Sequence, residues 1–266
     1  MKKKILLSTI VSFVLLAAVI AAGINAVFTV SDMRTEFCVY SADGRTEAAQ
    51  LQEKLGRYRG KSSTFLDLND VKNTVEQFPC LSAERVEKQY PSAVYVEVRE
   101  RKETYAVPKE GGFAVFDEAG CYLYDKETNV CRLDGGENIL LEGFVFTYTA
   151  RQSAQGEYAQ ELFAAFDALC TQLTEIRANA QRAELKKFSS DERNHFFYIY
   201  MREGVLLSIK NPAKAIGEKS EAAVEKYLSL TDEQRVKGVI DVVDDLMTGS
   251  GVNVSYSEVF VPVPAL

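Results

Sequence analysis

The 266-residue sequence contains one histidine, His195, and 5 cysteines, none of which lies in a Cys-x-x-Cys pair. Histidine-rich zinc sites, zinc ribbons and thioredoxin-like redox centres are therefore excluded. A serine triad would have to use His195, but neither Ser-x-x-Lys nor Gly-x-Ser-x-Gly occurs to supply a nucleophile. His195 precedes Phe196-Phe197-Tyr198 and is predicted to lie at the edge of a strand. These absences favour an interaction protein over a hydrolase.

The sequence also lacks a surplus of basic residues. It has 31 Lys and Arg against 38 Asp and Glu, a net charge of −7. Proteins that bind nucleic acid need a basic face, so the net charge argues against this class. Without the three lysines at positions 2–4, 28 basic groups remain against 38 acidic ones, a net charge of about −10. That charge predicts little gain from an anionic membrane surface, and the part of the chain after the anchor is expected to stand away from it.

A long uncharged run follows the lysine-rich tip, residues 1–4. No charged residue occurs in residues 5–30, and the apolar residues 5–24 would span about 30 Å as a helix. The positive tip predicts a single transmembrane anchor in the cell membrane, with a cytoplasmic N-terminus and the bulk of the chain extracytoplasmic. A cleaved signal peptide is the alternative, with Ala21-Ala22-Gly23 as its cleavage site. Signal peptides usually have apolar regions of about 7–15 residues, so the length favours an uncleaved anchor.

Residues 31–102 are predicted to form an α+β domain with helices packed on one face of a sheet. Apolar residues recur at helical spacing in two stretches, and residues 94–99 alternate as a half-buried strand does. Asp67 or Asn69 is the predicted N-cap of the second helix, and Asp43-Gly44 is a predicted turn. The expected order is β-α-α-β-β: a strand at 37–40, helices at 48–58 and 67–78, and strands at 83–87 and 94–99.

Residues 103–254 are predicted to form a mostly antiparallel β-domain with packed helices, and residues 255–266 a C-terminal strand and tail. Short apolar runs separated by glycine-containing turns indicate the strands, and a wide apolar stripe indicates one long helix. The expected strands lie at 113–116, 121–124, 144–148, 183–188, 196–200, 205–209, 239–243 and 254–260, and the expected helices at 158–176 and 218–230.

Two segments resemble ligand-binding sites, one for phosphate and one for a divalent cation, but neither has the residue spacing that such a site requires. The segment 56–62 resembles a phosphate-binding loop, but only three residues separate its glycines where four are needed, and it follows a helix. Asp241, Asp244 and Asp245 have oxygen ligands for a divalent cation, but they lack EF-hand spacing and are explained by solvation at a strand end. No catalytic, cofactor-binding or metal-binding residue is predicted.

Several segments resemble the FtsQ/DivIB family of bacterial cell-division proteins. The arrangement of a basic tip, one membrane span and a β-α-α-β-β unit is similar to that of the family. The last helix and the following strand of the family resemble residues 218–230 and 239–241. Phe65-Leu66-Asp67-Leu68 looks like the start of the family's second helix, and Phe78-Pro79-Cys80-Leu81 looks like its hydrophobic-Pro turn. Residues 90–101 resemble the family's strand that ends in Val-x-Glu-Arg, and residues 116–120 resemble its Asp-x-x-Gly hairpin.

The resemblance implies a non-enzymatic bitopic scaffold with a POTRA domain next to the membrane, a β-domain and a short tail. It implies FtsB/DivIC-type and FtsL-type partners, met through addition of a strand to the last strand of the β-domain. Final strands are often sheet edges, and aromatic residues are common hot spots. The partner-binding residues that the resemblance implies are Val239, Ile240, Asp241, Val243, Val254, Tyr256, Val259 and Phe260.

Three alternatives remain open at the level of sequence. The predicted partner-binding residues can instead pack beneath their own sheet. The chain can be an anchored extracytoplasmic POTRA adaptor with a different partner. It can also be an anchored hydrolase that uses two carboxylates, which would need a cleft holding them about 5–9 Å apart.

Overall fold

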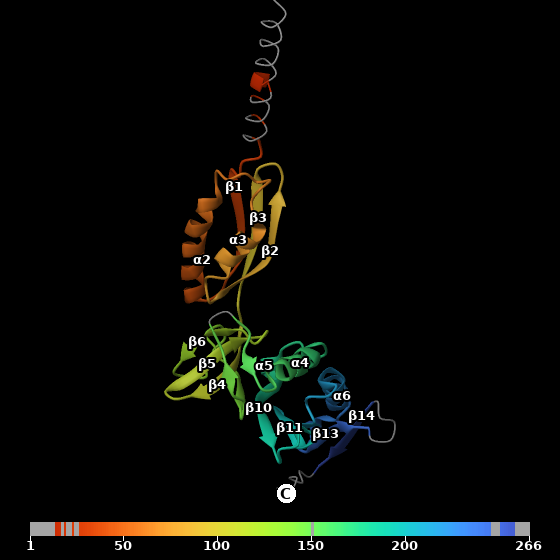
Figure 1. Cartoon of the computed structure of the whole chain (residues 1–266). Helices are drawn as coiled ribbons and strands as arrows, with labels where there is room; N and C mark the ends of the chain where they lie inside the picture. Colours follow the sequence, from red (N-terminus) through yellow and green to blue (C-terminus); the bar gives the residue numbers. More distant parts are fainter. Residues whose placement is uncertain are drawn as a thin grey trace, which may run out of the picture. The chain divides into compact units, whose positions relative to one another are not determined.

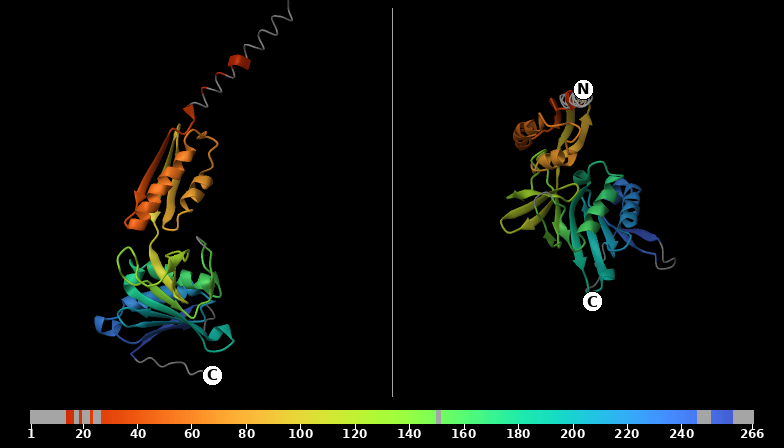
Figure 2. Two further views of the ribbon diagram at one scale, coloured as in Figure 1. Left: turned by 90° about the vertical axis from the view of Figure 1, so that its left-hand side faces the viewer. Right: turned by 45° about the horizontal axis from the view of Figure 1, so that its top comes forward.

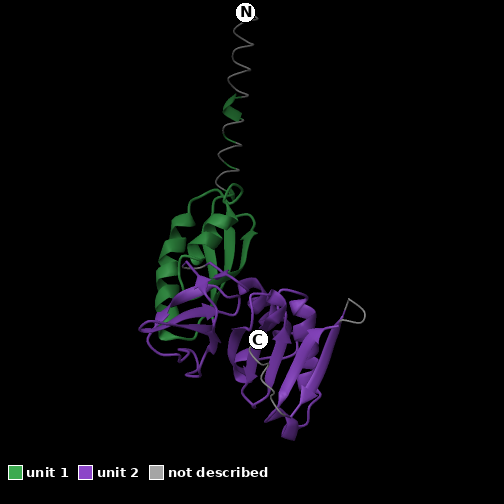
Figure 3. Ribbon diagram, turned by 60° about the horizontal axis from the view of Figure 1, so that its bottom comes forward, with its two compact units in different colours: residues 1–101 green, residues 102–266 purple. Residues whose placement is uncertain are grey.

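The chain divides into two compact units, Met1–Arg101 and Lys102–Leu266 (Figure 3). The computed structural model describes residues 14–16, 19, 23, 27–149, 152–245 and 251–258. Most of the predicted anchor, residues 5–30, lies outside these described residues, and so do Val259 and Phe260. No helix among the described residues has the length and apolar character needed to cross a membrane.

Unit 1 is an α+β fold built on a three-stranded sheet (Figure 1). Its central strand, β3, pairs with β1 in parallel and with β2 antiparallel. Val94, Val96 and Val98 alternate along β3 and form the core together with apolar residues of both helices. The order β-α-α-β-β is confirmed. The elements are β1 (Asp32–Cys38), α2 (Ala42–Leu55), a 3-10 turn (Gly56–Tyr58), α3 (Leu68–Val75), β2 (Leu81–Gln89) and β3 (Ala93–Glu100).

The first helix begins earlier than the sequence predicts. Asp43 and Gly44, predicted to be a turn, lie in the first turn of α2. Ser41 is the N-cap, and its hydroxyl accepts a hydrogen bond from the Gly44 amide at 2.9 Å. The Glu100 carboxylate accepts bonds from the amides of Tyr40 and Ser41, at 2.7 and 2.9 Å. A Cβ at Gly44 would lie 2.7 Å from this carboxylate, so the glycine permits close approach to β3 rather than a chain reversal.

Unit 2 contains a nine-stranded sheet in the order β14-β13-β12-β11-β10-β7-β4-β5-β6. In the part that the structure describes, five neighbouring pairs are antiparallel and three are parallel, namely β13 with β12, β10 with β7 and β7 with β4. The sheet is therefore mixed, and the prediction of a mostly antiparallel domain is not confirmed. The strands are β4 (Glu103–Lys109), β5 (Gly112–Asp117), β6 (Tyr122–Lys126), β7 (Ile139–Glu142), β10 (Ala180–Lys187), β11 (His195–Met201), β12 (Leu206–Lys210), β13 (Val239–Asp244) and β14 (Val252–Ser257); β8 (Phe146–Thr147) and β9 (Gln155–Gly156) pair separately.

Helices α4 (Ala159–Cys170) and α6 (Ile216–Leu228) pack on the sheet of unit 2 and on each other (Figures 1 and 2). Their apolar faces share one core with strand residues such as Phe197, Ile199 and Ile240. A smaller cluster on the other face of the sheet contains Phe196, Tyr198, Leu206 and Val239. Alternate residues of β11 therefore enter two different clusters, which explains its continuous apolar sequence.

Two predicted elements of unit 2 differ from the structure, and two strands of its large sheet are additional to the prediction. The long helix predicted at 158–176 is divided into α4 and the short α5 (Ile176–Asn179). Strands β4 and β7 were not predicted, and the predicted strand at 144–148 is reduced to the two residues of β8. β7 has only four residues and joins two longer strands by parallel pairing, which depends on partners distant in the sequence.

Candidate partner-binding edge

Strand β14 forms one edge of the nine-stranded sheet. It pairs antiparallel with β13 from Val239↔Ser257 to Asp244↔Val252. Within the described residues no strand pairs with its other side. An unpaired strand side presents backbone N–H and C=O groups to an added strand. The last described strand is thus an edge that another chain can extend.

The two faces of β14 have different surroundings. Val252, Val254 and Tyr256 are half-buried and pack against the core that includes α6, whereas Asn253, Ser255 and Ser257 are exposed. The alternation matches the period of a strand with one covered face. Part of this strand therefore packs under its own sheet, as the alternative from the sequence expected, while its other face remains accessible.

Tyr256 is directed into unit 2. Its hydroxyl donates toward the carbonyl oxygens of Gln234 and Lys237, each at 3.2 Å. Gly238 lies beneath the ring with φ +95°, and a Cβ at this position would come within 2.9 Å of the Tyr256 hydroxyl. Tyr256 consequently holds β14 in place, and an added strand would meet the backbone of β14 rather than this ring.

The predicted residues of β13 occupy an interior strand. β12 flanks β13 on one side and β14 on the other, and Val239 and Ile240 are buried because they pack in the smaller cluster and in the main core, respectively. Asp241 and Val243 are half-exposed and pair with Ser255 and Asn253 of β14. Asp241, Val243 and their partners on β14 lie on one face of the sheet, and Ile240 and Tyr256 lie on the other. The structure thus brings Asp241 and Val243 together with the edge, and it removes Val239 and Ile240 from direct contact.

A buried lysine fixes the end of β13. The ammonium of Lys219, in α6, is fully buried and donates to the carbonyl oxygens of Lys210 and Asn211, both at 2.8 Å. It also pairs with the Asp244 carboxylate at 3.1 Å, which accepts a further bond from the Asn211 side chain at 2.9 Å. Asp244 is therefore an ion-pair partner. Among the described residues no group of three or more His, Cys, Asp and Glu side chains is placed to hold a metal ion.

The pKa values of both Lys219 and Asp244 are lowered, and the surroundings of the two groups explain why. Burial lowers the pKa of Lys219, although Asp244 favours its charged form. Burial would raise the pKa of Asp244, but the bonds from Asn211 and Lys219 outweigh it and lower the pKa. The sequence gives no signal for this pair, because a lysine in an amphipathic helix is expected on the exposed face.

His195 has a structural position. It is the first residue of β11 and is buried. Nε2 lies 2.9 Å from the carbonyl oxygen of Ser189, to which it donates, and Nδ1 forms a hydrogen bond of 2.8 Å with the Tyr158 hydroxyl. Both ring nitrogens are thus engaged in holding the start of the strand.

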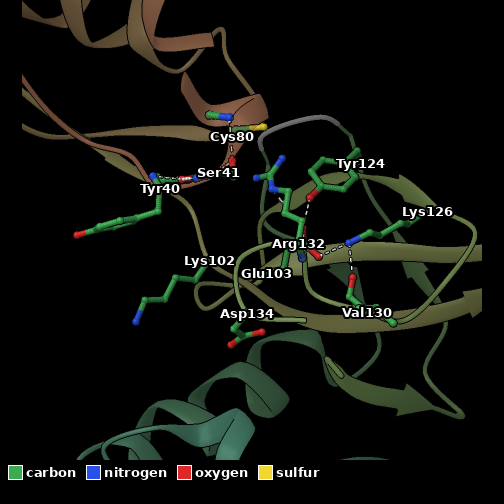
Figure 4. A network of polar contacts seen from close by, with 12 residues as sticks. Tyr40, Ser41, Cys80, Lys102, Glu103, Tyr124, Lys126, Val130, Arg132 and Asp134 are labelled. Carbon is green, nitrogen blue, oxygen red and sulfur yellow. Dashed lines mark hydrogen bonds and ion pairs between the residues drawn. The ribbon is translucent and has the colours of Figure 1, made fainter. Parts of the chain in front are cut away.

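A buried carboxylate organises the opposite edge of the sheet. The Glu103 side chain, at the start of β4, has no exposed surface. It accepts from the Tyr124 hydroxyl and pairs with Lys126 at 2.8 Å and with Arg132 at 3.3 Å (Figure 4). Two cations and a phenol around one carboxylate supply the partners that a buried charge requires. This network joins β4, β6 and the segment that leads to β7.

The comparison with protein families concerns unit 1. Residues 41–101 match the family described as the POTRA domain, FtsQ-type. Unit 1 contains an FtsQ-type POTRA domain. The matched residues include α2, α3, β2 and β3, and β1 completes the sheet of this POTRA domain. A search of curated proteins found no match to the chain.

Proposed function

We propose that this chain is a non-enzymatic, bitopic scaffold of the bacterial division machinery and a member of the FtsQ/DivIB family. The observation that carries the proposal is the FtsQ-type POTRA domain at residues 41–101. The uncharged run at 5–30 supplies an anchor, so both units lie outside the cytoplasm. The proposed partners are the FtsB/DivIC-type and FtsL-type bitopic proteins that bind during septum formation.

The free edge of unit 2 supports a specific mode of binding. A partner segment in extended conformation would pair with the backbone of β14 as a tenth strand. Main-chain hydrogen bonds then provide affinity, and the accessible side chains Asp241, Val243, Asn253 and Ser255 provide specificity. Val254 and Tyr256 stabilise the edge from beneath. Val259 and Phe260 follow β14 after Glu258 in the sequence and would extend the same contact as apolar anchors.

The proposal is tested by affinity capture of the tagged full-length chain from its native membrane, with mass spectrometry of the captured proteins. The full chain should recover the FtsB/DivIC-type and FtsL-type proteins. A chain that ends at Glu258 retains β14 and should recover them in reduced amount, because the proposed apolar anchors are missing. A chain that ends at Asp245 lacks β14 and should lose them. Capture of other proteins by a folded bait would favour a POTRA adaptor with a different partner.

A further inference from the structure

We propose that the end of the POTRA domain at which the chain enters, around Phe28, Phe65 and Tyr90, is a lipid-contact surface that lies in the headgroup region of the bilayer. The inference rests on the proposed membrane anchoring of residues 5–30. It adds a second membrane attachment, made by the folded domain itself. Its consequence is a POTRA domain held directly against the membrane instead of moving freely on a tether.

Hydrogen bonds fasten three segments to one another at this end. The Ser63 hydroxyl lies 2.8 Å from the carbonyl oxygen of Phe28 and 2.6 Å from that of Pro91, and its single proton is shared between these two acceptors. The Ser63 amide donates to Phe28 at 2.6 Å, and the Ser31 amide donates to Ser92 at 2.8 Å. The entering chain, the loop before α3 and the β2–β3 turn therefore form one rigid platform. Figure 1 shows the β2–β3 turn at the same end of this unit as the start of β1.

Large apolar side chains project from this platform. Phe65 is 88% exposed, Tyr90 61% and Val27 53%. Phe28 lies against Tyr90, with ring centroids 6.2 Å apart. In the described part of the POTRA domain and its entering chain, residues 27–101, Tyr40 is the other large apolar residue with comparable exposure, at 73%, and it follows the opposite end of β1. Exposed aromatic residues grouped on a rigid platform mark a binding surface.

The bilayer is the occupant that the position of this surface favours. The uncharged run of residues 5–30 ends within the platform, so the proposed anchor places these rings next to the lipid headgroups. Tyrosine is favoured at this depth, because its ring can remain apolar while its hydroxyl contacts water, and phenylalanine side chains add apolar area at the boundary between headgroups and acyl chains.

The charges of the platform agree with this occupant. The loop at residues 56–64 contains three basic residues and no acidic one, and Arg59 and Lys61 are exposed. Two acids of the neighbouring strands pair with arginines, Asp32 with Arg34 at 2.9 Å and Glu87 with Arg85 at 2.6 Å, and the exposed Asp67 caps α3 by accepting from the Asn69 amide. The local basic loop can attract anionic headgroups within about 10 Å even though the chain as a whole is acidic.

The test uses the absence of tryptophan from the chain, because one introduced tryptophan then reports from a single position. The full-length Phe65→Trp chain is reconstituted in phosphatidylethanolamine/phosphatidylglycerol vesicles that contain lipids brominated near the headgroup end of the acyl chains. Its emission should shift to shorter wavelength and be quenched by these lipids. Tyr40→Trp is the matched control, an exposed aromatic position at the far end of the same domain, and its emission should be the same with and without bromine.

Leu15→Trp reports on the anchor and should be quenched by lipids brominated near the methyl end of the chains. If Leu15→Trp is quenched while Phe65→Trp behaves like Tyr40→Trp, the lipid-contact surface is wrong and the anchor stands. If Leu15→Trp is not quenched, the anchor and this inference both fail. A blue shift of Phe65→Trp without quenching would show that protein covers the ring, either a second copy or a partner, and would also overturn the inference.

Discussion

Asp244→Asn is expected to lower the free energy of unfolding of unit 2 by about 3–5 kcal/mol. The ammonium of Lys219 is fully buried, and Asp244, at 3.1 Å, is the acid paired with it. The substitution keeps the size of the side chain, but the buried ammonium of Lys219 then has only neutral hydrogen-bond acceptors around it. Core amides of β12 and β13 should therefore exchange with deuterium at least about a hundredfold faster, as measured by mass spectrometry.

The double variant Asp244→Asn/Lys219→Met is the control for this effect. Removing both charges together should recover most of the lost stability, because the penalty comes from an unpaired buried charge. Amides of unit 1 should not change in either variant. A loss for Asp244→Asn that stays below 1 kcal/mol, or equal losses in the single and double variants, would contradict the role of the pair.

The same pair predicts a dependence on pH. The pKa of Asp244 is lowered by folding, so its contribution to stability is present above the unfolded value of about 3.9 and is lost as the pH falls through the folded value. The wild type and Asp244→Asn should therefore converge in stability in acid. Burial lowers the pKa of Lys219, so its buried charge reduces the free energy of unfolding. This destabilisation decreases as the pH rises towards the unfolded pKa of about 10.4.

Glu103→Ala is expected to destabilise the opposite edge of the same sheet by a similar amount, about 3–5 kcal/mol. Glu103 has no exposed side-chain surface, and its removal leaves Lys126 and Arg132, which are 22% and 14% exposed, without this counter-charge. Urea unfolding of unit 2, followed by near-ultraviolet circular dichroism of its tyrosines, measures the loss.

Glu127→Ala is the matched control for Glu103→Ala. This acid lies directly after β6 and is exposed, so its removal should change the stability by less than about 0.5 kcal/mol. Equal effects of the two substitutions would show that Glu103 is not the centre of the network.

The POTRA domain could be predicted from the sequence because its signals are local. Two amphipathic helices and an alternating valine strand specify their own elements, and Asp67, one of the two predicted N-caps, is the N-cap of α3. The sequence does not predict the start of α2, because Gly44 is needed for close approach to Glu100, which is 56 positions away in the sequence. A glycine in a close approach cannot be distinguished by sequence from a glycine in a turn.

Unit 2 was predicted less completely because its parallel pairs and buried charges depend on distant partners. β13 was predicted as a strand, but its interior position follows from pairing with both β12 and β14. Lys219 and Glu103 look like surface residues until tertiary structure surrounds them with acceptors or cations. The edge position of β14 was expected from its place as the last strand, and the inward direction of Tyr256 was not.

The central claim is that a partner binds along β14, and site-specific photo-crosslinking in living cells tests it most directly. A photoreactive amino acid replaces Ser255 on the accessible face of β14 or, as a control, Asp125 on β6 at the other edge of the sheet. We expect a crosslink from position 255 to an FtsB/DivIC-type or FtsL-type protein and none from position 125. A crosslink to these proteins from position 125 alone, or from neither position in a folded chain, would contradict the account.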